Sequence, residues 1–208
     1  GVTREDGFEA ILIQGSGTFG VESVLSSVIP STGHLLILAN GAYGERIVKM
    51  ASILKIGTVV LRCREDETPA PDLLSRTIEA HPEISHVAVV HCETTTGILN
   101  PIEEIGRRVK ALGRDFIVDA MSSFGGVPID LKAAQIDYLI SSANKCLEGV
   151  PGSSFVIARR EPLLASAGCA RSMSLDLLGQ LQGFEENGQF RFTPPTHTLL
   201  AFDQALRE

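Results

Sequence analysis

The runs Phe116-Ile117-Val118-Asp119-Ala120 and Ile136-Asp137-Tyr138-Leu139-Ile140 decide the fold of this chain. Both are short and mostly apolar, as expected of parallel strands that are buried on both faces. The first run ends in an acid, and the second is followed within a few residues by Lys145. Side chains at the carboxyl ends of strands converge on the ligand crevice of an α/β sheet, so we expect Asp119 and Lys145 to lie close together.

The same pattern extends along the whole chain, where short apolar runs alternate with amphipathic stretches. Strands are expected at residues 10–13, 35–38, 58–61, 86–90, 116–118, 138–140 and 155–158. Helices are expected at residues 18–29, 44–54, 71–80 and 101–112, with a last helix after the rigid bend at 193–196. This β-α alternation predicts an α/β fold in which helices cover both faces of a mostly parallel central sheet, a three-layer αβα arrangement.

Composition narrows the classes of function. The chain has 208 residues, a formal net charge of −7 and a pI of about 5.3, which disfavours nucleic-acid or membrane-surface binding because both need a basic face. No apolar run approaches the roughly 20 residues of a membrane span, and no secretory signal opens the chain. The scattered cysteines lack the CxxC spacing of a zinc or redox site, so no metal is expected and a cytoplasmic location is predicted.

The stretch Gln14-Gly15-Ser16-Gly17-Thr18-Phe19-Gly20 follows the first expected strand and opens a helix. It satisfies the GxGxxG pattern of dinucleotide-binding oxidoreductases, but that pattern also wants an acid at the end of the next strand, where Asn40 stands. The hydroxyls of Ser16 and Thr18 at a helix N-terminus suit a compact phosphate monoester instead. A plain β–α turn is the third interpretation.

Two further strand ends carry polar or aromatic residues. Tyr43 follows the second strand and is suited to stack on a flat ring or to pack in the core. The threonines at 94–96 follow the fourth strand and are suited to bind a ligand or to cap a helix. His91 is interpreted as a satisfied histidine near the core.

Asp119 and Lys145 carry the strongest chemical expectation. A buried acid is costly unless it is paired, and a lysine directly after a buried strand suits a desolvated reactive amine better than a surface charge. A helix cap for Asp119 and an ordinary solvated charge for Lys145 are the alternatives. Together, a lysine that forms a Schiff base and an acid that holds a pyridinium nitrogen are what a protein supplies to pyridoxal phosphate (PLP).

These motifs coincide with those of a known family, because the chain resembles the class V, fold-type I PLP-dependent aminotransferases. They span nearly the whole chain in the family's order, which is more specific than any one motif. The segments that carry the resemblance are 15–18, 40–44, 93–97, 118–126, 142–152 and 192–197.

The resemblance implies a role for each residue. Lys145 would hold PLP and move the substrate proton, and Asp119 would keep the ring nitrogen protonated. The phosphate would be held by Ser16, Gly17 and Thr18. The remaining cofactor-binding residues would be Tyr43 and Met121 on the two ring faces, Thr94 (with Thr96 as its rival) beside the ring hydroxyl, Asn144 as a phosphate helper, and Thr193 supplied to the phosphate by a neighbouring subunit.

The resemblance also implies a reaction and an architecture. The segment 144–152 favours family members that move the amino group of 2-aminoethylphosphonate to pyruvate, giving phosphonoacetaldehyde and L-alanine. Alanine–glyoxylate or serine–pyruvate transfer is the sibling alternative, and a PLP-binding chain without turnover is another. Residues 1–208 would form the large, PLP-binding domain of a homodimer, without the family's N-terminal segment and small C-terminal domain, which carries the substrate-binding arginine.

Overall fold

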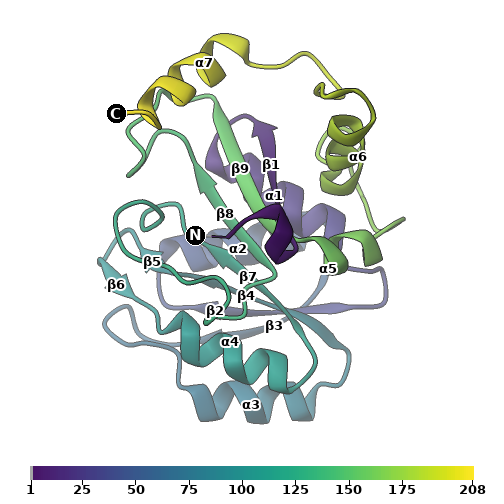
Figure 1. Ribbon diagram of the computed structural model, residues 1–208. Coiled ribbons are helices and arrows are strands. Elements are labelled where there is room, and N and C mark those ends of the chain that lie inside the picture. The colour runs from purple at the N-terminus through teal and green to yellow at the C-terminus, as the bar shows by residue number, and fades with distance from the viewer. Residues whose placement is uncertain (1) are drawn as a thin grey trace.

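The computed structural model describes residues 2–208, and a seven-stranded sheet forms its centre (Figure 1). The strand order is β1-β9-β8-β7-β4-β2-β3. In residues 2–208, β9 is the one strand of this sheet that runs against the others, pairing antiparallel with both β1 and β8. The prediction of a mostly parallel central sheet is therefore confirmed. The strands are β1 (Phe8–Gln14), β2 (His34–Ala39), β3 (Gly57–Arg62), β4 (Ile84–Val90), β7 (Asp115–Asp119), β8 (Tyr138–Ser142) and β9 (Ser153–Arg159).

Helices cover both faces of the sheet, as expected from the β-α alternation. One apolar layer joins the sheet to α1 (Gly17–Val28), α2 (Ala42–Ile53), α5 (Arg160–Ala165) and α6 (Leu177–Asn187). The other joins it to α3 (Pro71–Ala80) and α4 (Ile102–Ala111), which lie together beneath the sheet in Figure 1. The last helix, α7 (Thr196–Ala205), packs Phe202 against a smaller cluster at the start of β9.

Local sequence explains where several helices begin and end. Pro71 stands at the first turn of α3, where its missing N–H costs nothing. Asp176 caps α6 by accepting the amide of Gly179 at 3.0 Å, and Gly188 ends this helix in the left-handed conformation. Pro101 directly precedes α4, so that helix begins one residue later than the sequence predicted.

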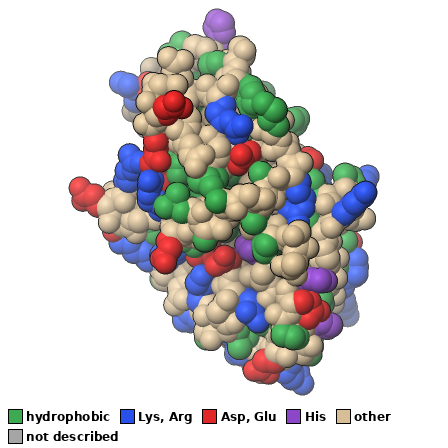
Figure 2. All heavy atoms as spheres, turned by 90° about the vertical axis from the view of Figure 1, so that its right-hand side faces the viewer, with side chains coloured by type: hydrophobic (Ala, Val, Ile, Leu, Met, Phe, Trp, Pro, Cys, Tyr) green, Lys and Arg blue, Asp and Glu red, His purple; other side chains and the backbone are tan. Residues whose placement is uncertain are grey.

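The short pieces were not predicted. A two-stranded hairpin joins β5 (Cys92–Glu93) to β6 (Ile98–Leu99), and a 3-10 turn, η1 (Arg4–Asp6), precedes β1. No helix of residues 2–208 is both long and apolar enough to cross a membrane. On the face of α5 and α6, shown in Figure 2, acidic and basic side chains are interspersed around a central group of apolar ones.

The strand order places the expected site at one edge. β7 and β8 are parallel neighbours, and the amide of Ala120 donates to the carbonyl of Ile140 at 2.9 Å. β1 reaches the same edge through β9, because the Gly15 amide donates to the Gly152 carbonyl at 2.9 Å. The ends of β1, β7 and β8 therefore open onto a common space.

Candidate active site

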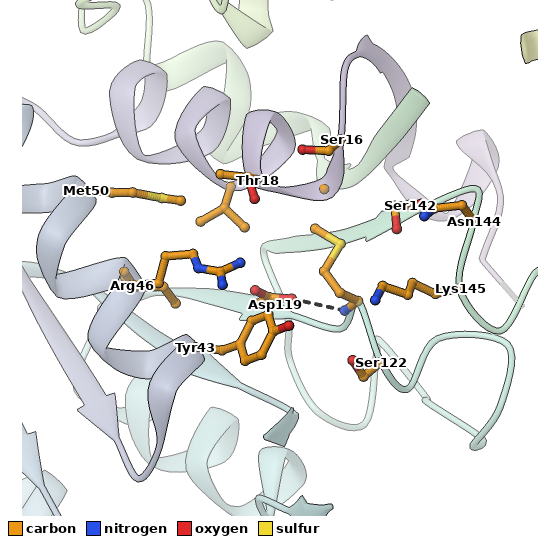
Figure 3. A pocket seen from close by; sticks show the side chains of 14 residues that line it. Ser16, Thr18, Tyr43, Arg46, Met50, Asp119, Ser122, Ser142, Asn144 and Lys145 are labelled. Atoms are coloured by element: carbon orange, nitrogen blue, oxygen red, sulfur yellow. Dashed lines mark hydrogen bonds between the residues drawn. The ribbon is translucent and has the colours of Figure 1, made fainter. Parts of the chain in front are cut away.

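The carboxyl ends of β1, β7 and β8 and the first turns of α2 enclose a cavity of about 230 Å³ (Figure 3). This space is several times the roughly 30 Å³ that one water molecule occupies. Most of the residues singled out in the sequence line it. They are Ser16, Gly17, Thr18, Tyr43, Asp119, Met121, Asn144 and Lys145.

The turn before α1 is built to hold an anion. Ser16 precedes the helix with its hydroxyl free of any capping bond, and the amides of Gly17 and Thr18 have no acceptor within the helix. A helix N-terminus attracts negative charge, so these groups suit a phosphate. A Cβ at residue 17 would lie 2.3 Å from the sulfur of Met121, so a larger residue here would displace that side chain.

Asp119 ends β7 and is only 6% exposed. Its Oδ1 accepts the Met121 amide at 3.0 Å, drawn as a dashed line in Figure 3, and within residues 2–208 its Oδ2 accepts no hydrogen bond. Burial raises the pKa of the Asp119 carboxyl to about 6, and the Glu93 carboxylate adds to the rise. The Met121 amide and the cations Arg46 and Lys145 act in the opposite direction. The free oxygen can therefore receive a cationic N–H donor.

Lys145 lies in the loop after β8, across the cavity from Arg46 and Tyr43 of α2 (Figure 3). The expectation of a desolvated amine is corrected here, because Lys145 and its neighbour Asn144 are both exposed. The loop turns outward as soon as the strand ends, so small residues after an apolar strand do not by themselves ensure burial. The amine still lines the same cavity as Asp119, as the strand order requires.

Tyr43 and Met121 approach the cavity from different elements. Tyr43 is half-buried in the first turn of α2, and Met121 is buried directly after β7. The Met121 side chain reaches the backbone of Gly17, so it fills the space between the anion-binding turn and Asp119. A flat ring held between the turn before α1 and Asp119 would have the side chains of Tyr43 and Met121 within reach.

The structure does not bring Thr94 and Thr193 to the cavity wall of this chain. Thr94 is exposed, but its hydroxyl lies 2.6 Å from that of Ser122, which does line the cavity. Thr193 is exposed in the segment between α6 and α7. Its predicted contact with a neighbouring subunit stays a prediction.

Three polar lining residues were not singled out in the sequence. Ser122 and Ser142 follow or end strands beside Asp119 and Lys145, so the rule that found those two residues applies to them as well. Arg46 stands three residues after Tyr43, a spacing that puts both on one face of a helix.

Polar residues at two other strand ends stabilise the fold and do not line the cavity. The buried Glu93 accepts the amides of Tyr43 at 3.1 Å and Gly44 at 3.2 Å, which fixes the N-terminus of α2. Asn40 and Asn100 exchange hydrogen bonds of 2.9 and 3.1 Å and are both buried. The place of the ribose-binding acid is thus occupied by a paired amide, which speaks against the dinucleotide interpretation.

His91 is a satisfied histidine, as expected. Its Nδ1 lies 2.9 Å from the hydroxyl of Ser123, and burial lowers the pKa of its imidazole. It lies outside the cavity described above.

These residues fit pyridoxal phosphate. An anion-binding turn, an aromatic ring, a buried acid with one oxygen free of hydrogen bonds from residues 2–208 and an amine surround one cavity of an αβα sheet. This arrangement and the strand order define the fold class as that of the fold-type I PLP-dependent transferases.

The chain belongs to the class-V aminotransferase family, whose model matches residues 5–207. It is 56% identical over 207 residues to the 2-aminoethylphosphonate–pyruvate transaminase of Syntrophobacter fumaroxidans, and 53% identical to that of Klebsiella pneumoniae. Each match covers 99% of this chain and 56% of the relative. The chain therefore spans about half the length of these curated relatives. PLP is the cofactor of this family, which confirms the predicted cofactor at the level of the family.

Solved structures agree with this assignment. The chain is similar to pyridoxamine–pyruvate aminotransferase from Mesorhizobium loti, with a TM-score of 0.87 and 28% identity over 95% of this chain and 51% of the other. It is also similar to alanine–glyoxylate aminotransferase from Nostoc sp., with a TM-score of 0.85 and 29% identity over 95% of this chain and 53% of the other. The predicted fold class is confirmed.

Proposed function

We propose that the protein is a PLP-dependent aminotransferase that moves the amino group of 2-aminoethylphosphonate to pyruvate, giving phosphonoacetaldehyde and L-alanine. The observation that carries this proposal is the single cavity that Asp119, Lys145 and the turn at Ser16 share. Relatives that are 56% and 53% identical over the 207 aligned residues bear the name of this reaction.

The lining residues divide the work of holding the cofactor. Ser16, Gly17 and Thr18 bind the phosphate, with the amide of Asn144 as a helper. Tyr43 stacks on one ring face and Met121 packs on the other. The cofactor, when bound, supplies an electron sink for the substrate carbon.

Asp119 and Lys145 supply the charges of the reaction. The Asp119 carboxylate, when ionised, accepts the ring N–H and holds that nitrogen protonated. The Lys145 amine binds the cofactor and afterwards takes a proton from the substrate carbon and returns it.

Thr94 and Thr193 complete the proposed site. The 2.6 Å contact between the hydroxyls of Thr94 and Ser122 supports a role for Thr94, because Ser122 lines the cavity and would link Thr94 to the ring hydroxyl. Thr193 reaches the phosphate of a neighbouring subunit, which makes the protein a homodimer. We further propose that residues 1–208 form its large domain and that it works in the cytoplasm, with an amine donor and a 2-oxo acid as its partners.

Alanine–glyoxylate transfer is the second candidate, favoured by the likeness to the Nostoc sp. structure. Sequence identity favours the phosphonate reaction. The chain is 56% identical to the phosphonate relative and 29% identical to the glyoxylate one.

Borohydride reduction followed by peptide mass spectrometry tests the site. The protein saturated with PLP is expected to carry a reduced adduct on Lys145, and Lys145→Ala is expected to abolish it. Lys49→Ala, which removes an exposed lysine of α2 outside the cavity, should leave the adduct in place. An adduct on another lysine, or none, contradicts the assignment.

A steady-state assay tests the reaction. The protein that carries this chain is expected to form alanine from pyruvate with 2-aminoethylphosphonate as donor, at a higher kcat/KM than with serine as donor or with glyoxylate as acceptor. Adduct formation without turnover of any donor would instead support the alternative of an inactive PLP-binding chain.

A further inference from the structure

Arg46 is the cation of the cavity that the proposed reaction does not use. It stands on α2 one turn after Tyr43, and its guanidinium carbon lies 4.4 Å from the centre of the Tyr43 ring. A guanidinium at this distance over an aromatic face is an attractive cation–π contact. Within residues 2–208, Arg46 forms no ion pair with a carboxylate of 4.0 Å or less.

Arg46 also faces the acid of the cavity, and Figure 3 shows it extending from α2 toward Asp119. Arg46 and Tyr43 face Asp119 from α2, and Glu93 approaches from β5. Lys145 faces it from the loop after β8. Of these groups, the cations Arg46 and Lys145 favour the ionised carboxyl, whereas burial and Glu93 oppose it.

These contacts suit a cavity that must be ready for a cationic ring. An unpaired buried carboxylate becomes neutral rather than remain charged, and a neutral carboxyl has lost the charge that attracts a pyridinium. A flat ring also needs its stacking partner in a fixed orientation, and the guanidinium of Arg46 restricts the Tyr43 ring from one side.

We propose that Arg46 is a positioning residue that orients the Tyr43 ring and keeps Asp119 ionised until a bound cofactor's ring nitrogen takes over that charge. This inference rests on the proposed function, since it concerns the same cavity. It assigns to α2 an electrostatic task in cofactor capture. Arg46 acts through Tyr43 and Asp119 and takes no part in proton transfer.

The test compares PLP affinity across pH for variants of α2 in the intact protein that carries this chain. Arg46→Met removes the charge but keeps an unbranched stem, and Arg46→Lys keeps the charge but loses the flat group. Lys49→Met removes the same charge from an exposed position of the same helix. Affinity is measured by spectroscopic titration between pH 6 and pH 8.

The expected result depends on pH. Arg46 is an exposed side chain, and loss of its charge raises the pKa of the Asp119 carboxyl; we take a rise of about one unit, the lower end for a nearby opposite charge. From a value of about 6 for Asp119, this lowers the ionised fraction about fivefold at pH 6 and hardly at all at pH 8. Arg46→Met should thus weaken PLP binding about fivefold more at pH 6 than at pH 8, whereas Arg46→Lys should keep the original pH profile. Titration of the cofactor itself cancels, because every variant binds the same molecule.

A second background separates the two roles. In Asp119→Asn protein, Arg46→Met should no longer change the pH profile, and only a loss independent of pH, due to Tyr43, should remain. Arg46→Met that binds PLP like Lys49→Met at every pH would overturn the inference. If instead the unaltered protein forms no adduct on Lys145, the proposed function itself fails, so the two failures are distinguishable.

Discussion

Asp119 is an acid in a buried position, where the neutral carboxyl is more stable than the ionised one relative to water. Its folded-state pKa of about 6 lies above the ordinary value of 3.8, so the unfolded chain gives up this proton at lower pH than the folded one. Stability from this group is therefore complete below pH 3.8 and is lost as pH rises through 6. The ionised carboxyl therefore lowers the free energy of unfolding at neutral pH, as expected of a residue whose role is to bind a cofactor.

This conflict predicts that Asp119→Asn stabilises the protein without cofactor. A shift of about two pKa units corresponds to a gain of up to about 3 kcal/mol at pH 8, with almost none near pH 4. Urea unfolding at both pH values measures it. A gain of equal size at both would mean that the substitution acts through packing instead of charge.

How far the site can be predicted from sequence depends on the residue. Asp119 and Ser16 were found because each follows an apolar run that had to be a strand, and strand ends converge. Arg46 was missed because a helical arginine is ordinarily a solvated charge, and only the packed structure shows which face it turns to. The exposure of Lys145 was missed because the path of a loop after its strand is not written in a short motif.

At the scale of elements, α2 depends on a buried acid from another segment. Glu93 accepts two amides at the N-terminus of this helix, where negative charge is favoured. Glu93→Gln keeps the shape but removes the charge, and we expect it to lower the free energy of unfolding by about 1–2 kcal/mol. Thermal unfolding and urea titration measure the loss.

A matched control is Glu103→Gln in the first turn of α4. Glu103 is exposed and its contact with Arg107 is 3.9 Å long, so little change is expected. Equal losses in the two variants would show that Glu93 has no special role at α2.

The turn before α1 offers a steric test. In Gly17→Ala, the added Cβ collides with the sulfur of Met121, so the turn or the methionine must shift. PLP affinity is expected to fall at least tenfold, and Met121→Ala in the same chain should restore part of it by vacating the space. Failure of the double variant to bind better than Gly17→Ala would mean that the new methyl group obstructs the phosphate itself.

Helices and strands could be predicted where their apolar residues follow a clear pattern. β2 and β4 each contain a continuous apolar run, and the structure gives them nearly the predicted bounds. The hairpin of β5 and β6 is too short to show periodicity, and α5 and α6 follow no clear pattern of strand and turn. β9 runs antiparallel both to β8, its neighbour along the chain, and to β1, and the pairing with β1 is a contact between distant segments that local sequence does not encode.

At the scale of the whole molecule, four charges tie the two ends of the chain together. Glu9 of β1 and Glu185 of α6 each contact both Arg4 and Arg160. Arg160 lies 2.6 Å from each carboxylate. The Arg160 guanidinium lowers the pKa of the Glu185 carboxyl, so this contribution to stability is present at neutral pH and is lost as pH falls through that lowered value.

This network predicts that Arg160→Met loosens α6. The Tm should fall at low salt, the fall should shrink in molar salt because exposed charges are screened, and amide exchange should quicken within α6. Arg107→Met, which breaks only an exposed pair within α4, is the control. Equal protection of α6 amides in the variant and the original protein would contradict this role.

The pairing of β1 with β9 determines the order in which the protein can fold and bind its cofactor. These strands are joined by a chain of more than a hundred residues, and such distant contacts are slow to form during folding. The Gly15–Gly152 hydrogen bond that aligns the anion-binding turn with the lysine loop can exist only once that closure is complete. Coenzyme uptake would then report on the last step of refolding. The visible absorbance of the bound coenzyme would appear with the last kinetic phase, after secondary structure has already formed.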